Sequence, residues 1–213
     1  MKVILFGATG MVGQGVLREC LLDPEVESVL AVGRTATGVR HAKLRELLRP
    51  DLFDLPALDG FDACFFCLGV SSVGMSEQDY RRVTHDLTLS VAGRLAGQEK
   101  LTFVYVSGAG TDERGRSMWA RVKGRTENAL LALPFQAYMF RPGYIQPLHG
   151  ITSRTRWYRL AYVVVAPLYP LLRRLFPAQV TTTEQIGRAM LGVARRGWPR
   201  RVLGPKDINE VRP

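Results

Sequence analysis

A glycine-rich loop between an apolar run and a helical pattern constrains the fold of this chain more than any other feature. The apolar run KVILF (2–6) predicts a buried strand, and FGATGMVGQGV (6–16) follows it directly. Gly7, Gly10 and Gly13 have the spacing G-x-x-G-x-x-G. The first permits a tight turn, the second lets a pyrophosphate approach the backbone, and the third lets the helix pack closely on the strand. Amide groups at the helix start would then point at phosphates, so the loop predicts a dinucleotide site.

The rest of the chain alternates between strand and helix patterns. The run DACFFCLG (62–69) is almost wholly apolar, as parallel strands buried on both faces are. We therefore predict an α/β fold with a doubly wound parallel sheet (a Rossmann fold) in a single domain, 1–213, in which 148–213 adds a small helical cap or substrate region. The expected strands are 2–6, 28–33, 43–48, 62–69, 101–108, 135–143 and 201–204, and the expected helices are 11–22, 77–97, 117–132 and 181–197, with helix and turn over 153–176.

Composition narrows the possible partners and compartments. The formal net charge of +10 attracts anions, which include phosphorylated cofactors and acidic lipid headgroups, although a solvated basic face would look the same. Recognised nucleic-acid motifs are lacking, so no specific nucleic-acid partner is expected. Three cysteines in 213 residues indicate a reducing compartment, and a leader peptide is not recognisable, so a cytoplasmic location is expected. Cys64 and Cys67 would point to opposite faces of a strand, so no metal site is expected.

The end of the second predicted strand indicates which dinucleotide binds. An acidic residue about 20 positions after the loop would bind the ribose 2′-hydroxyl and favour NAD. The strand instead ends at Arg34, and no carboxylate occurs between Ser28 and His41. Because a guanidinium suits a 2′-phosphate, the sequence predicts NADP(H), with Arg40 or Lys43 as further cations. A plain surface arginine is the alternative.

Five motifs, in order and spacing, carry a resemblance to a known family. They are GATGMVG (7–13), FFCLGVSS (65–72), YVSGAGTD (105–112), WARVKGRTE (119–127) and FRPGYIQP (140–147). Together they resemble an atypical short-chain dehydrogenase/reductase, in particular the Tat-interacting-protein oxidoreductase family and its bacterial relatives. The resemblance covers residues 2–147 well and the remainder more loosely.

The resemblance implies a role for each matching residue. Arg34 would contact the adenosine 2′-phosphate and Asp51 the adenine. Ser107 would be catalytic or polarise the substrate. Lys123 would bind the ribose hydroxyls and lower the pKa of a neighbouring tyrosine. The other implied contacts are Gly7, Thr9, Gly10, Met11, Val12 and Gly13 at the phosphates, Leu68 and Gly69 on the path to the nicotinamide ribose, and Arg141, Pro142 and Gly143 at the nicotinamide end.

One position departs from the family pattern. Trp119 stands four residues before Lys123, where the family has the tyrosine that exchanges a proton with the substrate carbonyl. An indole N–H donates a hydrogen bond but is no usable acid or base. The site could therefore bind cofactor without turnover, or the substrate, such as a quinone or an imine, could need little acid catalysis. Alternatively, Tyr80, His85 or Tyr144 could supply the proton.

Two functions follow from these observations. The first is an NADP(H)-dependent oxidoreductase that reduces a small carbonyl-type substrate. The second is a cofactor-binding regulatory or interaction protein that does not turn over and acts through a protein partner. The basic and aromatic segment within 154–176 could contact a membrane peripherally or cover the substrate pocket. The long helices predicted at 77–97 and 117–132 could pair in a homodimer.

Overall fold

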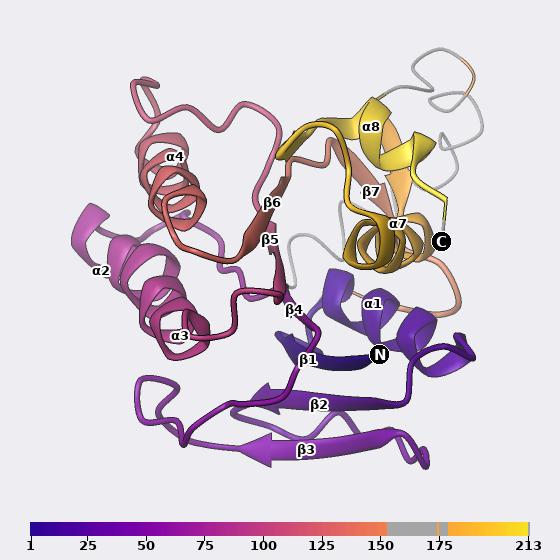
Figure 1. Ribbon diagram of the computed structural model, residues 1–213. Coiled ribbons are helices and arrows are strands. Elements are labelled where there is room, and N and C mark those ends of the chain that lie inside the picture. The colour runs from indigo at the N-terminus through magenta and orange to yellow at the C-terminus, as the bar shows by residue number, and fades with distance from the viewer. Residues whose placement is uncertain (153–173, 175–178, 213) are drawn as a thin grey trace.

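A parallel sheet with helices on both faces forms the body of the protein, as the alternating sequence pattern predicts (Figure 1). The computed structural model describes residues 1–152, 174 and 179–212. Within them, seven strands lie in the order β3-β2-β1-β4-β5-β6-β9, and every neighbouring pair is parallel. The strands are β1 (Lys2–Phe6), β2 (Ser28–Gly33), β3 (Leu44–Leu48), β4 (Ala63–Phe66), β5 (Thr102–Val106), β6 (Gln136–Phe140) and β9 (Val202–Leu203).

Helices cover the two faces of the sheet in two groups (Figure 1). Helices α1 (Met11–Leu22), α7 (Thr183–Arg196) and α8 (Pro205–Glu210) lie on one face. The other face carries α2 (Glu77–Arg81), the π-helical segment η1 (Arg82–Asp86), α3 (Leu87–Leu95) and α4 (Met118–Leu131). The predicted helix 77–97 is therefore interrupted by a π-helical turn. Elements that the sequence pattern did not indicate are α8 and a separate parallel pair, β7 (Tyr144–Gln146) and β8 (Val180–Thr182).

The side-chain alternation of the central strands divides the core in two. In β1, Val3 and Leu5 pack under α1 and α7, whereas Ile4 and Phe6 pack with the α3 side. Cys64 and Cys67 follow the same rule: Cys64 belongs to the α3-side core, and Cys67 packs against the α1-side core. The two cysteines thus lie on opposite faces, as strand geometry predicts.

The described part of the C-terminal region joins the body of the fold. Strand β9 extends the sheet beside β6, and α7 packs along α1. Glycines allow this close approach, because a Cβ on Gly15 would lie 2.6 Å from the Cβ of Thr183. Arg188 of α7 donates from Nε to the buried carboxylate of Glu19 at 3.1 Å, which joins the two helices. Helix α7 thereby stabilises the helix that follows the glycine loop.

The segment 153–176, with its expected helix, turn and membrane contact, lies outside the described residues except at position 174. Among the helices that are described, none is both long enough and apolar enough to cross a membrane.

Candidate functional site

The glycine loop has the geometry that its spacing predicts. Gly7 has φ +80°, and a Cβ there would lie 2.7 Å from the backbone of Cys67 and Leu68. A Cβ on Gly13 would lie 2.0 Å from the carbonyl oxygen of Gly7, so only glycine lets α1 pack so closely on the loop. No side chain caps α1 at Gly10, and its first turn has no acidic residue. The start of α1 therefore presents its amide groups and positive dipole end to an anion.

Two adjoining cavities surround this loop at the carboxyl ends of the strands. One, of about 350 Å³, extends over the ends of β2 and β3, and we call it the β3-side cavity. The other, of about 540 Å³, extends towards the residues after β4, and we call it the β4-side cavity. The residues that line both are Gly7, Thr9, Arg34, Leu52 and Leu68. Open parallel sheets bind ligands in such a crevice, where the strand order reverses next to β1.

Most of the residues expected at the cofactor meet at these cavities. Arg34 directly follows β2, and Asp51 follows β3, so parallel pairing places both at the same edge of the sheet. Asp51 accepts the backbone N–H of Phe53 through Oδ1 at 2.9 Å. Val12 and Gly13 lie behind the loop in the first turn of α1. The predicted residues that line at least one of the cavities are Gly7, Thr9, Gly10, Met11, Arg34, Asp51, Leu68 and Gly69.

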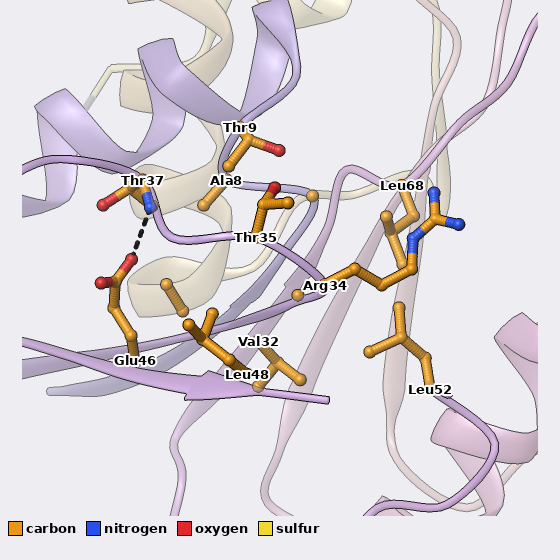
Figure 2. Close-up of a pocket in the computed structure, with 13 residues that line it drawn as sticks. Ala8, Thr9, Val32, Arg34, Thr35, Thr37, Glu46, Leu48, Leu52 and Leu68 are labelled. Atoms are coloured by element: carbon orange, nitrogen blue, oxygen red, sulfur yellow. Dashed lines mark hydrogen bonds between the residues drawn. The ribbon is translucent and has the colours of Figure 1, made fainter. Parts of the chain in front are cut away.

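The β3-side cavity also contains a carboxylate that the sequence analysis missed. Figure 2 shows Arg34 directed towards Leu52 and Leu68, with Glu46 and Thr37 at the opposite end of the cavity. The Oε1 atom of Glu46 accepts the backbone N–H of Thr37 at 2.7 Å. The stretch from Ser28 to His41, from which NADP(H) was predicted, contains no carboxylate, whereas Glu46 lies in the next strand, β3. Its place in the strand expected at 43–48 was the available signal.

A second cluster lies at the end of β5 and on α4. Ser107 is buried, and its hydroxyl lies 2.9 Å from the hydroxyl of Thr111. Lys123 donates from Nζ to the carbonyl oxygen of Val106 at 3.2 Å, so its ammonium lies beside the residue that precedes Ser107. Burial lowers the pKa of Lys123 to about 8, and the charge of Glu127 opposes this shift. The structure thus brings the two predicted catalytic residues to the same strand end.

The indole of Trp119 covers the loop that follows Ser107. A Cβ built on Gly108 would lie 3.8 Å from the indole ring, and one on Gly110 would lie 3.6 Å from it. Trp119 precedes Lys123 by four residues, so both side chains occupy one face of α4. The two cavities at the glycine loop are lined by neither Trp119 nor Ser107 nor Lys123.

The three alternative proton donors have different environments. Tyr80 lies in α2 and is only 2% exposed, so a substrate cannot reach its hydroxyl directly. His85 lies in the π-helical segment, where Nδ1 is 2.8 Å from Oδ1 of Asp86. The hydroxyl of Tyr144, in β7, donates to Oε1 of Gln146 at 2.9 Å.

The turn RPG (141–143) supports the loop after β5. Arg141 donates from Nε to the two carboxylate oxygens of the buried Glu127 at 3.0 and 3.1 Å, and from a terminal nitrogen to Oε2. The carbonyl oxygen of Pro142 accepts the N–H of Ala109 at 3.0 Å. A Cβ on Gly143 would lie 2.4 Å from the carbonyl oxygen of Gln179. The structure does not bring these three residues to either cavity, and their contact with a nicotinamide stays a prediction.

Comparison with known sequences gives distant relatives. No protein-family profile matches the chain. It is 29% identical over 156 residues to the mitochondrial protein fmp52 of Emericella nidulans, a match that spans 68% of this chain and 66% of that protein. It is 24% identical over 193 residues to the mitochondrial protein FMP52-1 of Scheffersomyces stipitis, a match that spans 84% of this chain and 84% of that protein. These curated relatives are named FMP52 proteins, not Tat-interacting proteins.

Solved structures establish the fold. The chain resembles the UDP-N-acetylglucosamine 4-epimerase of Methanobrevibacter ruminantium with a TM-score of 0.73 and 14% identity, over 95% of this chain and 75% of that one. A short-chain dehydrogenase/reductase from Saccharomyces cerevisiae aligns over 100% of this chain and 99% of its own, with a TM-score of 0.65 and 13% identity. The UDP-glucuronic acid 4-epimerase of Bacillus cereus, solved in complex with NAD, aligns over 96% and 76%, with a TM-score of 0.69 and 13% identity. The fold is therefore the Rossmann-like one of short-chain dehydrogenases and epimerases.

The comparisons correct the expected location. The relatives in Emericella nidulans, Scheffersomyces stipitis and Eremothecium gossypii are all named as mitochondrial, which contradicts the cytoplasmic expectation. The expectation was wrong because a low cysteine count reports redox conditions, and these do not identify a compartment.

Proposed function

We propose that this protein is an NADP(H)-binding oxidoreductase of the short-chain dehydrogenase/reductase type that reduces a small carbonyl-type compound. One observation carries the proposal: the glycine loop, the uncapped start of α1 and the cation Arg34 converge on the same pair of cavities. Solved proteins of the same fold contain NAD, including the Bacillus cereus epimerase, and this supports a dinucleotide as the ligand. The preference for NADP(H) rests on Arg34.

Each part of the cavities suits one part of the cofactor. The amides that start α1 would hold the pyrophosphate, because their positive dipole end has no acidic competitor. The apolar side chains of Leu52 and Leu68 would pack on the adenosine, with Asp51 near the adenine. Arg34 lines both cavities, and its guanidinium would pair with the 2′-phosphate.

The cluster at the end of β5 would orient the substrate. When bound, the cofactor would supply the hydride for the carbonyl carbon, and the proton for the oxygen would come from water. The Ser107 hydroxyl, oriented by Thr111, would donate a hydrogen bond to the substrate oxygen as negative charge develops there. The Lys123 ammonium lies one residue away, at the Val106 carbonyl, and would add positive potential. Because Trp119 cannot transfer a proton, we favour a substrate such as a quinone or an imine, whose reduction needs little acid catalysis.

A cofactor-binding protein without turnover is the second candidate. The indole of Trp119 covers Gly108 and Gly110, directly after Ser107. Such a cover over the catalytic loop would restrict access for a substrate. In this second proposal the dinucleotide would stabilise one state of the protein, and a protein partner would recognise that state.

Calorimetric titration with NADPH and, separately, NADH tests the cofactor assignment. Replacing Arg34 by alanine should lower the affinity for NADPH by about tenfold or more, because a charge-assisted hydrogen bond contributes about 1.5–3 kcal/mol. The affinity for NADH should change by less than about threefold, since it lacks the phosphate. Arg40→Ala is the matched control, because the structure places Arg40, which the sequence suggested as a further cation, exposed in the same connection and outside both cavities. Equal losses of affinity for NADPH and NADH in Arg34→Ala would refute the role of Arg34. If the wild type bound neither cofactor, the cofactor site itself would be refuted.

Turnover distinguishes the two candidates. The purified protein would be mixed with NADPH and a panel of small ketones, aldehydes and ortho-quinones, and the loss of NADPH absorbance would be followed. Turnover that disappears in Ser107→Ala, with NADPH affinity retained, would support the oxidoreductase. Tight NADPH binding with no turnover of any probe would favour the regulatory candidate.

A further inference from the structure

The loop after β2 is held in place by a carboxylate from β3. Thr37 donates its backbone N–H to Oε1 of Glu46 at 2.7 Å, and its hydroxyl accepts the N–H of Val39 at 3.2 Å. Gly38, with φ +78°, turns the chain directly after Thr37. Figure 2 shows the bond between Thr37 and Glu46 at the end of the β3-side cavity opposite to Arg34.

Strand geometry fixes the position of Glu46. In β3, Leu44, Glu46 and Leu48 share one face, because side chains alternate along a strand. Leu44 packs against the α1-side core, and Leu48 lines the cavity, so Glu46 between them faces the same side. Glu46 pairs in register with Ala31 of β2, whose small side chain also lines the cavity. The carboxylate is therefore part of the cavity wall.

This arrangement bears on the proposed cofactor site. In dinucleotide-binding folds the residues just after β2 contact the ribose 2′ position. A 2′-phosphate is bound by cations and by backbone N–H groups, and here the N–H of Thr37 is already taken by an anionic group. Arg34 does not neutralise that group, since the two side chains are directed to opposite ends of the cavity. A 2′-phosphate at the Thr37 N–H would therefore meet the negative charge of Glu46, whereas Arg34 would attract the phosphate towards the other end of the cavity.

We propose that Glu46 is a specificity-determining residue, whose carboxylate competes with the 2′-phosphate of NADPH for the Thr37 N–H and leaves the site open to NADH. The inference rests on the proposed function, because it concerns the same cofactor site. Arg34 raises the affinity for NADPH, and Glu46 limits the selectivity that Arg34 alone would provide.

The test is the ratio of the NADH to the NADPH dissociation constant, measured by calorimetry for the wild type and two variants. Glu46→Gln retains an acceptor for the Thr37 N–H and removes the charge, so it should raise the ratio about three- to tenfold through tighter NADPH binding. Glu46→Ala removes the acceptor as well, and reports whether the bond to Thr37 also holds the loop. Titration with 2′,5′-ADP and 5′-AMP, which differ only in the 2′-phosphate, should show the same change in ratio.

Glu99→Gln is the charge control, because Glu99 is exposed and lines neither cavity. It should leave the ratio unchanged, and thermal unfolding should show that all variants fold. An unchanged or lower ratio in Glu46→Gln would overturn the inference even if Arg34→Ala confirmed the NADP(H) site. Equal weakening of both cofactors by both Glu46 variants would also overturn it, since Glu46 would then only hold the loop. If the wild type bound neither cofactor, the proposed function would fail first, and this inference with it.

Discussion

Gly13 offers a direct test of how the glycine loop is built. Replacing it by alanine places a Cβ 2.0 Å from the carbonyl oxygen of Gly7, 2.6 Å from its carbonyl carbon and 3.0 Å from the Cα of Ala8. All three are backbone atoms of the loop, so no side chain can rotate to relieve the clash. Either the backbone of α1 or that of the loop must therefore shift, because the atoms nearest to the new Cβ are all backbone atoms.

The expected cost follows from a matched pair of substitutions. Gly93 lies in α3, and a Cβ there meets no atom within 4 Å. Both glycines are helical, so both alanine variants gain about 0.5–1 kcal/mol of helix propensity. The difference between them isolates the clash at Gly13, which we expect to cost about 1–3 kcal/mol.

Thermal and urea unfolding without cofactor measure this difference. A change of 1 kcal/mol corresponds to a shift in Tm of about 2–4 °C for a chain of this size. Gly93→Ala should therefore raise Tm slightly. Gly13→Ala should have a Tm several degrees below that of Gly93→Ala and should also lose NADPH binding. Equal Tm shifts in the two variants would refute the close contact between α1 and the loop.

Two further predictions concern the cluster at the end of β5. Trp119→Tyr should raise the rate of ketone reduction at least about tenfold, because it places a proton donor one turn before Lys123, and general acid catalysis contributes about 10²–10⁴-fold. The rate of quinone reduction, which needs little acid catalysis, should change much less, and an unchanged ketone rate would argue against Ser107 and Lys123 as a reduction site. Burial lowers the pKa of Lys123 from 10.5 to about 8. Between these two pH values the unfolded chain therefore binds more protons than the folded protein, so the free energy of unfolding rises with pH. Relative to Lys123→Met, we expect this free energy to rise by about 1–3 kcal/mol across the window. Urea unfolding of both proteins below pH 8 and near pH 10 measures that difference, and a difference that stays constant with pH would show that Lys123 is solvated.

Local patterns in the sequence were sufficient for much of the fold. The apolar runs at 2–6 and 28–33 form β1 and β2 as predicted, because a strand buried on both faces must be apolar along its whole length. The strand expected at 43–48 also forms, as β3. The helix at 77–97 was predicted as continuous, and the π-helical turn Arg82–Asp86 was missed because one added residue in a turn barely disturbs an apolar periodicity.

The candidate site, like the fold, could be predicted from the sequence only in part. The glycine loop and Arg34 could be placed from the sequence, because each directly follows a predicted strand and parallel strands end at one edge of the sheet. Asp51 was placed there only by the family resemblance. Arg141 was expected at the nicotinamide end, and the structure pairs it with Glu127, fourteen residues earlier in the chain. Spacing along the chain could not indicate that partner, since two different elements meet there.

By itself, the sequence determined the strand–loop–helix unit at the N-terminus, the parallel sheet and the glycine loop at the start of α1. These depend on neighbours in the chain: glycine where a side chain would clash, apolar residues where a strand is buried, and amides at the start of a helix. Only the tertiary structure decided that Glu46 faces the cavity of Arg34 and that Trp119 covers the loop after Ser107. Both depend on which strand or helix lies beside which, and this is settled when the whole core packs.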